Sequence, residues 1–313
     1  APVIIPTLNR YSHFKRCLES LECCIGADKT DVYVGLDYPP SDSYVDGWKK
    51  IESYLSKKEE NNSFKKLIVF KRSQNCGISG PMSNSSLLMK EVAKNHSTYI
   101  FTEDDNEFSP NFLEFINIGL LKYEGDNRVL AVSGYLFPEI PEINDGPAFL
   151  AQFSSAWGTG YWFEKQFEHA KMGDKAFVDG VLYSWKTSWR LYKKRAASLN
   201  GFISMHFRNK YYEDVMKSAE MLIYEKYSLF PSSSKVRNWG HDGTGVHCDA
   251  TDKYIKQKID GNKEVDVFNS IPVLSISNLV DFPLYKRIAV LLRYIAFRCT
   301  GKDILSFYWM SKQ

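Results

Sequence analysis

The stretch STYIFTEDDNEFSPNF, residues 97–112, decides the fold class of this chain of 313 residues. Residues 97–101 have the pattern of a short strand, and three adjacent carboxylates follow it at Glu103, Asp104 and Asp105. Ser109 and Pro110 then mark a helix start, because serine caps helices and proline is favoured in their first turn. A strand that ends in polar residues and leads directly into a helix is the repeating unit of α/β folds.

Short strands and helical patterns alternate on both sides of this stretch through the first half of the chain. The predicted strands are residues 2–6, 31–36, 67–70, 97–101 and 129–133. The predicted helices are residues 14–21, 44–57, 79–95 and 110–120. This alternation predicts an α/β fold with a mostly parallel, Rossmann-like central sheet and helices on both faces. Ligands of such sheets bind beyond the carboxyl ends of the strands, so the turns there are the candidate site.

The second half of the chain is less regular. Its features are a Trp/Gly segment at 154–163, predicted helices at 182–197 and 209–222, and a glycine-rich loop at 240–247. No internal repeat or low-complexity linker separates the two halves. We therefore expect a single domain with a C-terminal helical extension, divided by role into residues 1–147, 148–280 and 281–313.

Composition narrows the class of protein. The apolar fraction of 44% allows a sizeable core, and a net charge of +3 does not favour a nucleic-acid surface. The first residues already have the pattern of a strand, so we expect no signal peptide. The six cysteines form no C-x-x-C pair, which favours reduced thiols and a cytoplasmic location. They are Cys17, Cys23, Cys24, Cys76, Cys248 and Cys299.

The acidic triplet Glu103, Asp104 and Asp105 is the sharpest chemical signal. Adjacent carboxylates repel one another, and a divalent cation relieves that repulsion. Oxygen ligands suit Mg²⁺ or Mn²⁺, and a diphosphate would supply further oxygens to the same ion. The alternative is a solvated acidic turn before the next helix.

The turns after the first two predicted strands carry further candidates. Asp37 ends the second strand, where it could accept a hydrogen bond from a ribose hydroxyl or a base N–H. The alternative for Asp37 is an ordinary turn residue. Arg10 follows the first strand, with Thr7 and Asn9 in the same turn, and could reach phosphates or form a structural salt bridge.

Three weaker signals lie elsewhere in the chain. Asn75 and Gly77 precede a predicted helix, where a glycine allows close backbone approach and the helix N-terminus favours an anion. Trp157 and Gly158 could pack a sugar against the indole face, or simply fill the core. His247, in the glycine-rich loop, could complete a metal shell or be structural.

Glu213 and Asp214 sit near the start of a predicted helix. Sugar transfer with inversion needs one carboxylate to take the proton from the acceptor hydroxyl. Neighbouring residues on a helix point about 100° apart, so only one of the two can face a site. The alternative is an acidic first turn that the helix dipole favours.

The C-terminal segment predicts an amphipathic helix over residues 284–299. Its apolar stripe consists of Leu284, Ile288, Leu291 and Ile295. Its basic residues are Lys286, Arg287, Arg293 and Arg298. These two sets favour contact with the cytoplasmic face of a membrane. Val290 and Phe297 fall on the opposite side of the helix, which favours ordinary core packing or an oligomer contact instead.

In their order, these features resemble the GT-A fold glycosyltransferases, above all bacterial surface-polysaccharide transferases and the Golgi N-acetylglucosaminyltransferase I group. The resemblance covers about residues 1–250. The motifs that carry it are PVIIPTLNR (2–10), Asp37, Asn75-Cys76-Gly77, YIFTEDD (99–105) with Ser109-Pro110-Asn111-Phe112, Trp157-Gly158, YEDVM (212–216) and the 240–247 loop.

The resemblance implies a metal-dependent, inverting transfer of a hexosyl or N-acetylhexosaminyl group. The donor would be a nucleotide-sugar, above all a UDP-sugar, and the acceptor a glycan or lipid-linked oligosaccharide in lipopolysaccharide or capsule synthesis. Residues 1–147 would bind the donor, and 148–280 would bind the acceptor and carry catalysis.

The resemblance also implies roles for single residues. By position, Asp105 would touch Mn²⁺ or Mg²⁺, while Glu103 and Asp104 would lie nearer the sugar and ribose. Asp37 would meet the base, and Arg10 the nucleotide. Either Glu213 or Asp214 would be the catalytic base, because two registers of the family motif are possible.

Two other functions are compatible with the same sheet topology. A nucleotidyltransferase that makes nucleotide-sugars normally has a glycine-rich basic loop after the first strand, and residues 7–10 contain no glycine. A glycan-binding protein without catalytic activity is the second. Turnover of a donor by the purified chain distinguishes both from a transferase.

Overall fold

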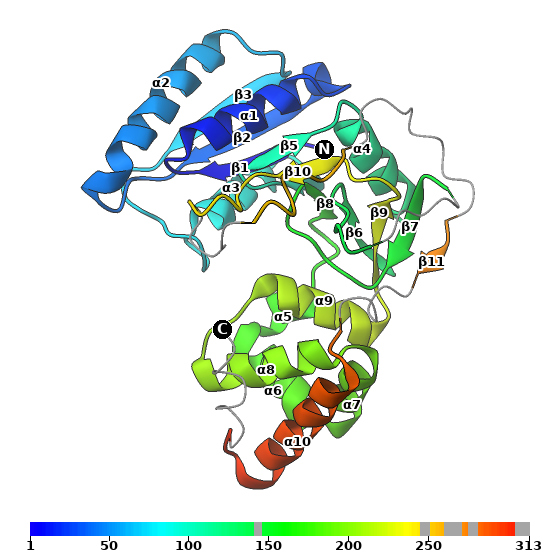
Figure 1. Cartoon of the computed structure of the whole chain (residues 1–313). Coiled ribbons are helices and arrows are strands. Elements are labelled where there is room, and N and C mark those ends of the chain that lie inside the picture. Colours follow the sequence, from blue (N-terminus) through cyan, green and yellow to red (C-terminus); the bar gives the residue numbers. More distant parts are fainter. Residues whose placement is uncertain (141–145, 245–250, 260–270, 275–280, 304–313) are drawn as a thin grey trace. The chain divides into compact units, whose positions relative to one another are not determined.

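The computed structural model describes residues 1–140, 146–244, 251–259, 271–274 and 281–303. The chain folds as two compact units, and both are drawn in Figure 1. The sheet unit consists of Ala1–Leu150, Ser155–Lys165 and Leu229–Pro272. The helical unit consists of Ala151–Ser154, Gln166–Ser228 and Val273–Gln313.

This division differs from the expected single domain with boundaries at 147 and 280. The chain leaves the sheet unit after Lys165, builds most of the helical unit, and returns to the sheet unit at Leu229. The C-terminal helix then belongs to the helical unit and is no separate extension. The boundaries between the two units are not marked by a change in amino-acid composition, because the units are defined by contacts between segments that are distant in the sequence.

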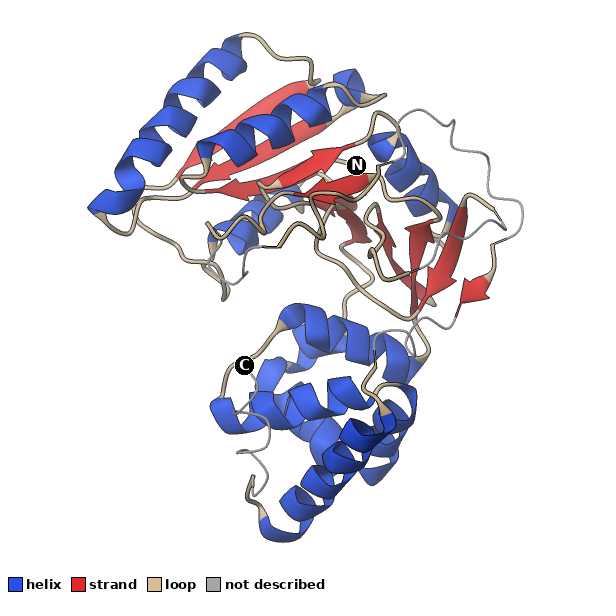
Figure 2. Cartoon of the chain, viewed as in Figure 1, coloured by secondary structure: helices blue, strands red, loops and turns tan. Residues whose placement is uncertain are grey.

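The chain forms a nine-stranded sheet of order β11-β7-β9-β6-β8-β4-β1-β2-β3 (Figure 2, red), and all of its strands except β11 lie wholly or mostly in the sheet unit. Strand β1 pairs in parallel with β2 and β4, and β2 pairs in parallel with β3, whereas β8 is antiparallel to β4 and β6. The α/β class with a large central sheet is therefore confirmed. The strands are β1 (Val3–Thr7), β2 (Asp31–Leu36), β3 (Lys66–Lys71), β4 (Thr98–Phe101), β6 (Val129–Ser133), β7 (Ala148–Ala151), β8 (Thr159–Trp162), β9 (Tyr227–Pro231) and β11 (Val273–Leu274).

Helices cover both faces of this sheet. Figure 1 shows α1 (Tyr11–Glu22) and α2 (Val45–Glu60) on one face and α3 (Asn84–Val92) on the other. Alternate strand residues point to opposite faces, so Ile4 and Tyr33 pack with Leu88 of α3. Helix α4 (Phe112–Lys122) packs on β6 and β8. The helix can approach this closely because residue 160 is a glycine. A Cβ at that position would lie only 2.6 Å from Ile116 Cγ2.

Short elements complete the unit. Strands β5 (Asn106–Phe108) and β10 (Val236–Asn238) form a separate two-stranded antiparallel sheet directly after the acidic triplet. The 3₁₀ turns η1 (Ala27–Lys29) and η2 (Asp42–Tyr44) precede β2 and α2.

Two predicted helix starts lie further along the chain than expected. Helix α3 begins at Asn84 and not near residue 79, because the Ser83 hydroxyl accepts the backbone N–H of Ser86 at 3.3 Å. Helix α4 begins at Phe112 because Asn111 is its N-cap residue, and Ser109 lies two residues before that position. Its hydroxyl donates to Asn111 Oδ1 at 2.7 Å, and its carbonyl accepts the Phe112 N–H.

The helical unit contains α5 (Glu168–Met172), α6 (Asp174–Tyr183), α7 (Trp185–Lys194), α8 (Ala196–Arg208), α9 (Glu213–Tyr224) and α10 (Leu284–Thr300). The single helix predicted at 182–197 is divided at Ser184 and Arg195, which both have extended backbones. The Ser184 side chain caps α7 by accepting the Thr187 N–H. Among the helices of the described ranges, none is long and apolar enough to cross a bilayer.

Helix α10 packs against its unit with the face opposite to the predicted stripe. Val290, Tyr294 and Phe297 are buried in the core of the helical unit, whereas Leu284 and Ile288 are exposed. Arg293 is also buried, where it donates to both carboxylate oxygens of Asp303 at 2.9 and 2.5 Å, and Arg287 pairs with Asp281. The helix is therefore part of a core, and a second apolar face remains outside it.

The burial of α10 predicts which of its residues carry stability. Phe297→Ala should lower the free energy of unfolding of the helical unit by about 3–5 kcal/mol, since it removes a buried ring and leaves a cavity. Leu292→Ala, on the exposed face, should cost less than about 1 kcal/mol. Urea unfolding followed by circular dichroism measures both. Equal losses for the two variants would contradict the packing described.

Candidate functional site

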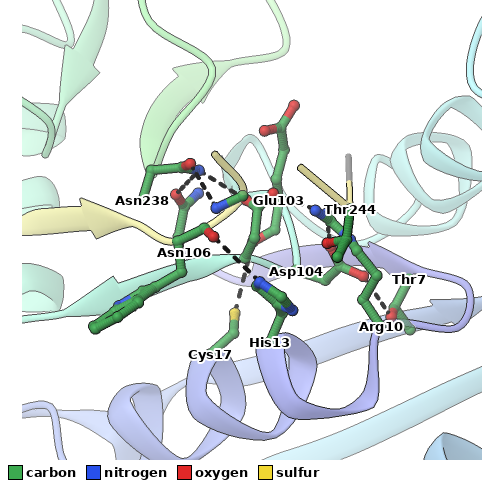
Figure 3. A network of polar contacts seen from close by, with 12 residues as sticks. Thr7, Arg10, His13, Cys17, Glu103, Asp104, Asn106, Asn238 and Thr244 are labelled. Carbon is green, nitrogen blue, oxygen red and sulfur yellow. Dashed lines mark hydrogen bonds and ion pairs between the residues drawn. The ribbon is translucent and has the colours of Figure 1, made fainter. Parts of the chain in front are cut away.

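The candidate site is built around an ion cluster at the carboxyl ends of β1 and β4. Asp104 and Asp105 follow β4 and are buried, and Arg10 follows β1. Arg10 Nη2 lies 2.5 Å from Asp104 Oδ1 and 2.8 Å from Asp105 Oδ2. The Thr7 hydroxyl donates to Asp104 Oδ2 at 2.8 Å, and Figure 3 shows Thr7 and Arg10 pointing toward Asp104. The structure thus brings together four predicted site residues.

Asp105 is held from a segment far along the chain. Asn238, the last residue of β10, donates to Asp105 Oδ1 at 2.8 Å and to Asn106 Oδ1 at 2.9 Å. The backbone of Gly240 passes so close that a Cβ there would overlap the Asp105 carboxylate. The pairing of β5 with β10 therefore sets the position of Asp105, and only glycine fits at residue 240.

Negative charge exceeds positive charge in this cluster. Burial, Asp105 and Asp104 together raise the pKa of Glu103 to about 8, although Arg10 and a hydrogen bond from Trp157 oppose the rise. Burial also raises the pKa of Asp104 above its ordinary value, against the attraction of Arg10. The two aspartates in turn raise the pKa of Arg10, although its burial alone would lower it. The Arg10 guanidinium is therefore the positive charge that compensates Asp104 and Asp105 by contact, and it also attracts Glu103.

This donor set fits a hard divalent cation in its chemistry. The acidic side chains offer carboxyl oxygens, and the two aspartates outnumber the one guanidinium, which favours a cation. Among the residues that the structure describes, no three His, Cys, Asp or Glu side chains converge as a metal site. The predicted cation ligand, Asp105, contacts Arg10 and Asn238 through its two carboxylate oxygens. His247, the predicted further ligand, lies outside the described residues.

Asp37 is the centre of a second cluster, at the end of β2. Its Oδ1 accepts the N–H groups of Tyr38 and Cys76, both at 2.9 Å. The Asn75 amide donates to Asp37 Oδ2 at 3.4 Å and to the Tyr38 carbonyl at 2.7 Å. Gly77 has a left-handed backbone with φ +71°. Asp37 and Asn75 thus contact each other from two segments of the chain, and Gly77 directly follows Cys76, whose N–H binds Asp37.

Thr7 connects the two clusters to each other, and Asn9 lies beside helix α2. The Asp37 N–H donates to the Thr7 carbonyl at 2.9 Å, while the Thr7 hydroxyl binds Asp104. Helix α2 approaches the same turn at Gly47, where a Cβ would overlap the Asn9 carbonyl. The turn after β1 therefore joins the Asp37 turn to the acidic cluster.

Aromatic rings lie beside Glu103. The Trp157 ring centroid lies 4.6 Å from that of Tyr135, 5.3 Å from that of Tyr254 and 5.6 Å from that of His241. Within the described ranges, the buried Tyr135 hydroxyl and His241 Nε2 have no hydrogen-bond partner. Trp157 therefore packs against other rings, beside two buried polar atoms that have no hydrogen-bond partner in the described part of the chain.

Gly158 allows the turn that carries Trp157. Its φ of +67° lies in the left-handed region, and a Cβ there would lie 2.9 Å from Phe112. A side chain at residue 158 would strain both the backbone and the packing, so this glycine has a structural role.

Glu213 and Asp214 are not part of these clusters. Both are exposed at the start of α9 in the helical unit, whereas the acidic cluster belongs to the sheet unit. Glu213 forms an ion pair with Lys217 at 2.7 Å, and the attraction of that ammonium lowers the pKa of Glu213.

Sequence reasoning missed Asn238, Trp239 and His13. The Trp239 indole donates to Glu107 at 2.8 Å, and Arg16 lies 4.0 Å from the Trp239 ring centroid. His13 Nε2 lies 3.2 Å from the Trp239 carbonyl and 3.1 Å from Asp242. The only signal was that Asn238 and Trp239 directly precede the glycine-rich loop.

No protein-family model matches the chain, and no curated protein matches it. Among solved structures, the chain is similar to TarS of S. aureus, with 16% identity and a TM-score of 0.35 over 51% of this chain and 28% of that one. It is also similar to the TarS 1–349 structure, with 12% identity and a TM-score of 0.41 over 99% and 77%.

A third similar structure is the mannosyltransferase PcManGT from Pyrobaculum calidifontis in complex with GDP-Man and Mn²⁺. Its identity is 15% and its TM-score 0.36, over 71% of this chain and 69% of that one. The chain thus spans less than a third of the first structure, TarS. With TM-scores below 0.5, these likenesses decide neither family nor function.

The raised pKa of Glu103 predicts how stability changes with pH. The folded chain keeps this proton up to about pH 8, whereas an unfolded glutamic acid releases it near its ordinary pKa of 4.5. The unfolded state therefore binds fewer protons between these values, so stability should fall as pH rises. Glu103→Gln should remove part of this fall, about 1.4 kcal/mol for each unit of pKa difference.

Urea unfolding between pH 4.5 and 8.5 measures this dependence. Glu124→Gln, at an exposed position, serves as the control and should keep the wild-type slope. An unchanged slope in Glu103→Gln would show that this carboxyl group has an ordinary pKa.

Proposed function

We propose that the chain is a glycosyltransferase that moves a sugar from a nucleotide-sugar donor to a glycan or lipid-linked acceptor. The observation that carries the proposal is that polar side chains from three parallel strands gather at one edge of the sheet. Arg10, Asp37 and Asp104 follow β1, β2 and β4, and Thr7 contacts both Asp37 and Asp104. In α/β sheets, this edge is where nucleotides bind.

The Asp37 cluster and the Arg10 cluster differ in chemistry, just as the nucleoside of a nucleotide-sugar differs from its diphosphate. The Asp37 turn offers carboxylate and amide groups that suit the ribose and base of a UDP moiety. Arg10 offers a guanidinium, which suits the diphosphate. Both aspartates already bind Arg10, so an incoming diphosphate would compete with them for its N–H groups.

We assign a divalent cation, Mn²⁺ or Mg²⁺, to Asp105, with Glu103 and Asp104 nearer the sugar and ribose. Bound there, the cation would act as a Lewis acid that offsets charge on the departing nucleotide. The excess of carboxyl groups over guanidinium in the cluster supports this assignment.

Catalysis and acceptor binding are assigned to residues after 147. Asp214 or Glu213 would take the proton from the acceptor hydroxyl in an inverting reaction. The ion pair with Lys217 makes Glu213 the weaker base, so we favour Asp214. Trp157 and Gly158 would lie against the transferred hexosyl or N-acetylhexosaminyl group. Lipopolysaccharide or capsule synthesis at the cytoplasmic face of a membrane is the proposed setting.

Removal of Asp105 tests the donor site. Asp105→Ala should lower the turnover of UDP-sugars by about 10²-fold or more, because it removes the proposed cation ligand. EDTA should abolish turnover in the wild type, and added Mn²⁺ should restore it there but not in the variant. Glu124→Ala is the matched control at an exposed position. A chain that binds the nucleotide-sugar without turning it over would instead be a binding protein.

Substitution of the two carboxylates in α9 tests the base. Asp214→Asn should lower kcat by about 10²–10⁴-fold with little change in donor affinity, because the acceptor hydroxyl would keep its proton. Glu213→Gln should have a smaller effect, since Lys217 already reduces the basicity of Glu213. Steady-state kinetics with a glycan acceptor, and Glu225→Gln as an exposed control, measure the difference. Wild-type kcat in both variants would place the base elsewhere.

A further inference from the structure

The outer face of α10 is apolar, and its side chains are exposed among the described residues of the helical unit. Leu284 is 74% exposed, Ile288 50% and Leu292 55%, and Ile295 continues the row at 40%. These residues recur at intervals of three or four, so they form one stripe along the helix. The stripe lies opposite the buried residues Val290, Tyr294 and Phe297. The helix is thus apolar on two faces, and the core uses only one.

Helix α7 runs antiparallel to α10 and extends this surface with tryptophans. Its start meets the end of α10, where the ring centroids of Trp185 and Tyr294 lie 5.2 Å apart. Its end meets the start of α10, where Arg287 donates to the carbonyls of Tyr192 and Lys193. Trp185 and Trp189, on the same side of α7, are about half exposed. Figure 1 shows α7 beside α10.

The charged side chains of α7 and α10 themselves are all basic. Neither residues 185–194 nor residues 284–302 include an acidic side chain. The nearest acids in sequence, Asp281 and Asp303, are paired with Arg287 and Arg293. Lys186 and Lys193 of α7 and Lys302 after α10 are exposed. The result is an apolar stripe with tryptophans and lysines at its margin.

We propose that this α7–α10 surface docks on an anionic lipid bilayer, with the stripe of α10 lying in the interface. Helices that lie in a membrane surface combine an apolar face, basic residues and interfacial tryptophans in this way. The lysines complement anionic headgroups. A second copy of the chain fits less well, because a symmetric contact places each patch against itself and brings like charges together. The proposal does not depend on the sugar-transfer reaction.

Sedimentation of the full chain with vesicles tests the apolar stripe. Vesicles of phosphatidylcholine with phosphatidylglycerol should bind the wild type, and Ile288→Asn/Leu292→Asn should weaken binding by about ten- to hundredfold. Ile25→Asn/Leu121→Asn is the matched control, since these residues of the sheet unit are 58% and 77% exposed. The control should bind like the wild type, and both variants should remain folded at the temperature of the assay, as circular dichroism measures.

A second pair of variants tests the charge. Lys186→Glu/Lys193→Glu should weaken binding to the phosphatidylglycerol vesicles, and added salt should weaken binding of the wild type. Vesicles of phosphatidylcholine alone should bind poorly in every case. Equal binding of the stripe variant and its control would overturn the proposal. So would a mass in light scattering that is dimeric for the wild type and monomeric for the stripe variant, because the surface would then join two copies. Donor turnover is not measured, so failure here leaves the proposed reaction untouched.

Discussion

The contact of Arg10 with Asp104 and Asp105 constrains the whole sheet unit. Two buried carboxylates beside one another are costly unless a positive charge compensates them, so the residues that supply that charge must be brought close. Arg10 can reach them only if β1 and β4 are neighbours, and they are paired in parallel. The contact therefore requires the pairing of β1 with β4 and a turn after β1 that brings Arg10 to the end of β4.

The same cluster depends on a segment more than a hundred residues away. Asn238 reaches Asp105 because β10 pairs with β5, and Gly240 leaves room for the carboxylate. The chain crosses into the helical unit and returns before it supplies these residues. A change in β10 would therefore act on the acidic cluster through Asn238, without touching any of the predicted site residues directly.

In the helical unit, α10 combines two roles that usually exclude each other. Val290 and Phe297 fill the core, whereas Ile288 and Leu292 stay exposed to water. Exposed apolar surface of this kind contributes nothing to the stability of the isolated unit and favours association. The helix therefore stabilises its own unit with one face and leaves apolar side chains exposed on the other.

Local patterns determined the α/β class, the strands at β1, β2, β4 and β6, and the grouping of Arg10, Asp37 and Asp104 at one edge. Strand periodicity and helix starts are properties of neighbouring residues, and parallel strands bring their carboxyl ends together. Only the tertiary structure decided the break at Ser184, the buried face of α10 and the role of Asn238. These features depend on contacts between residues far apart in the chain, and the sequence of α10 is apolar on both sides. The burial of Val290 and Phe297 was decided by the helices that surround them.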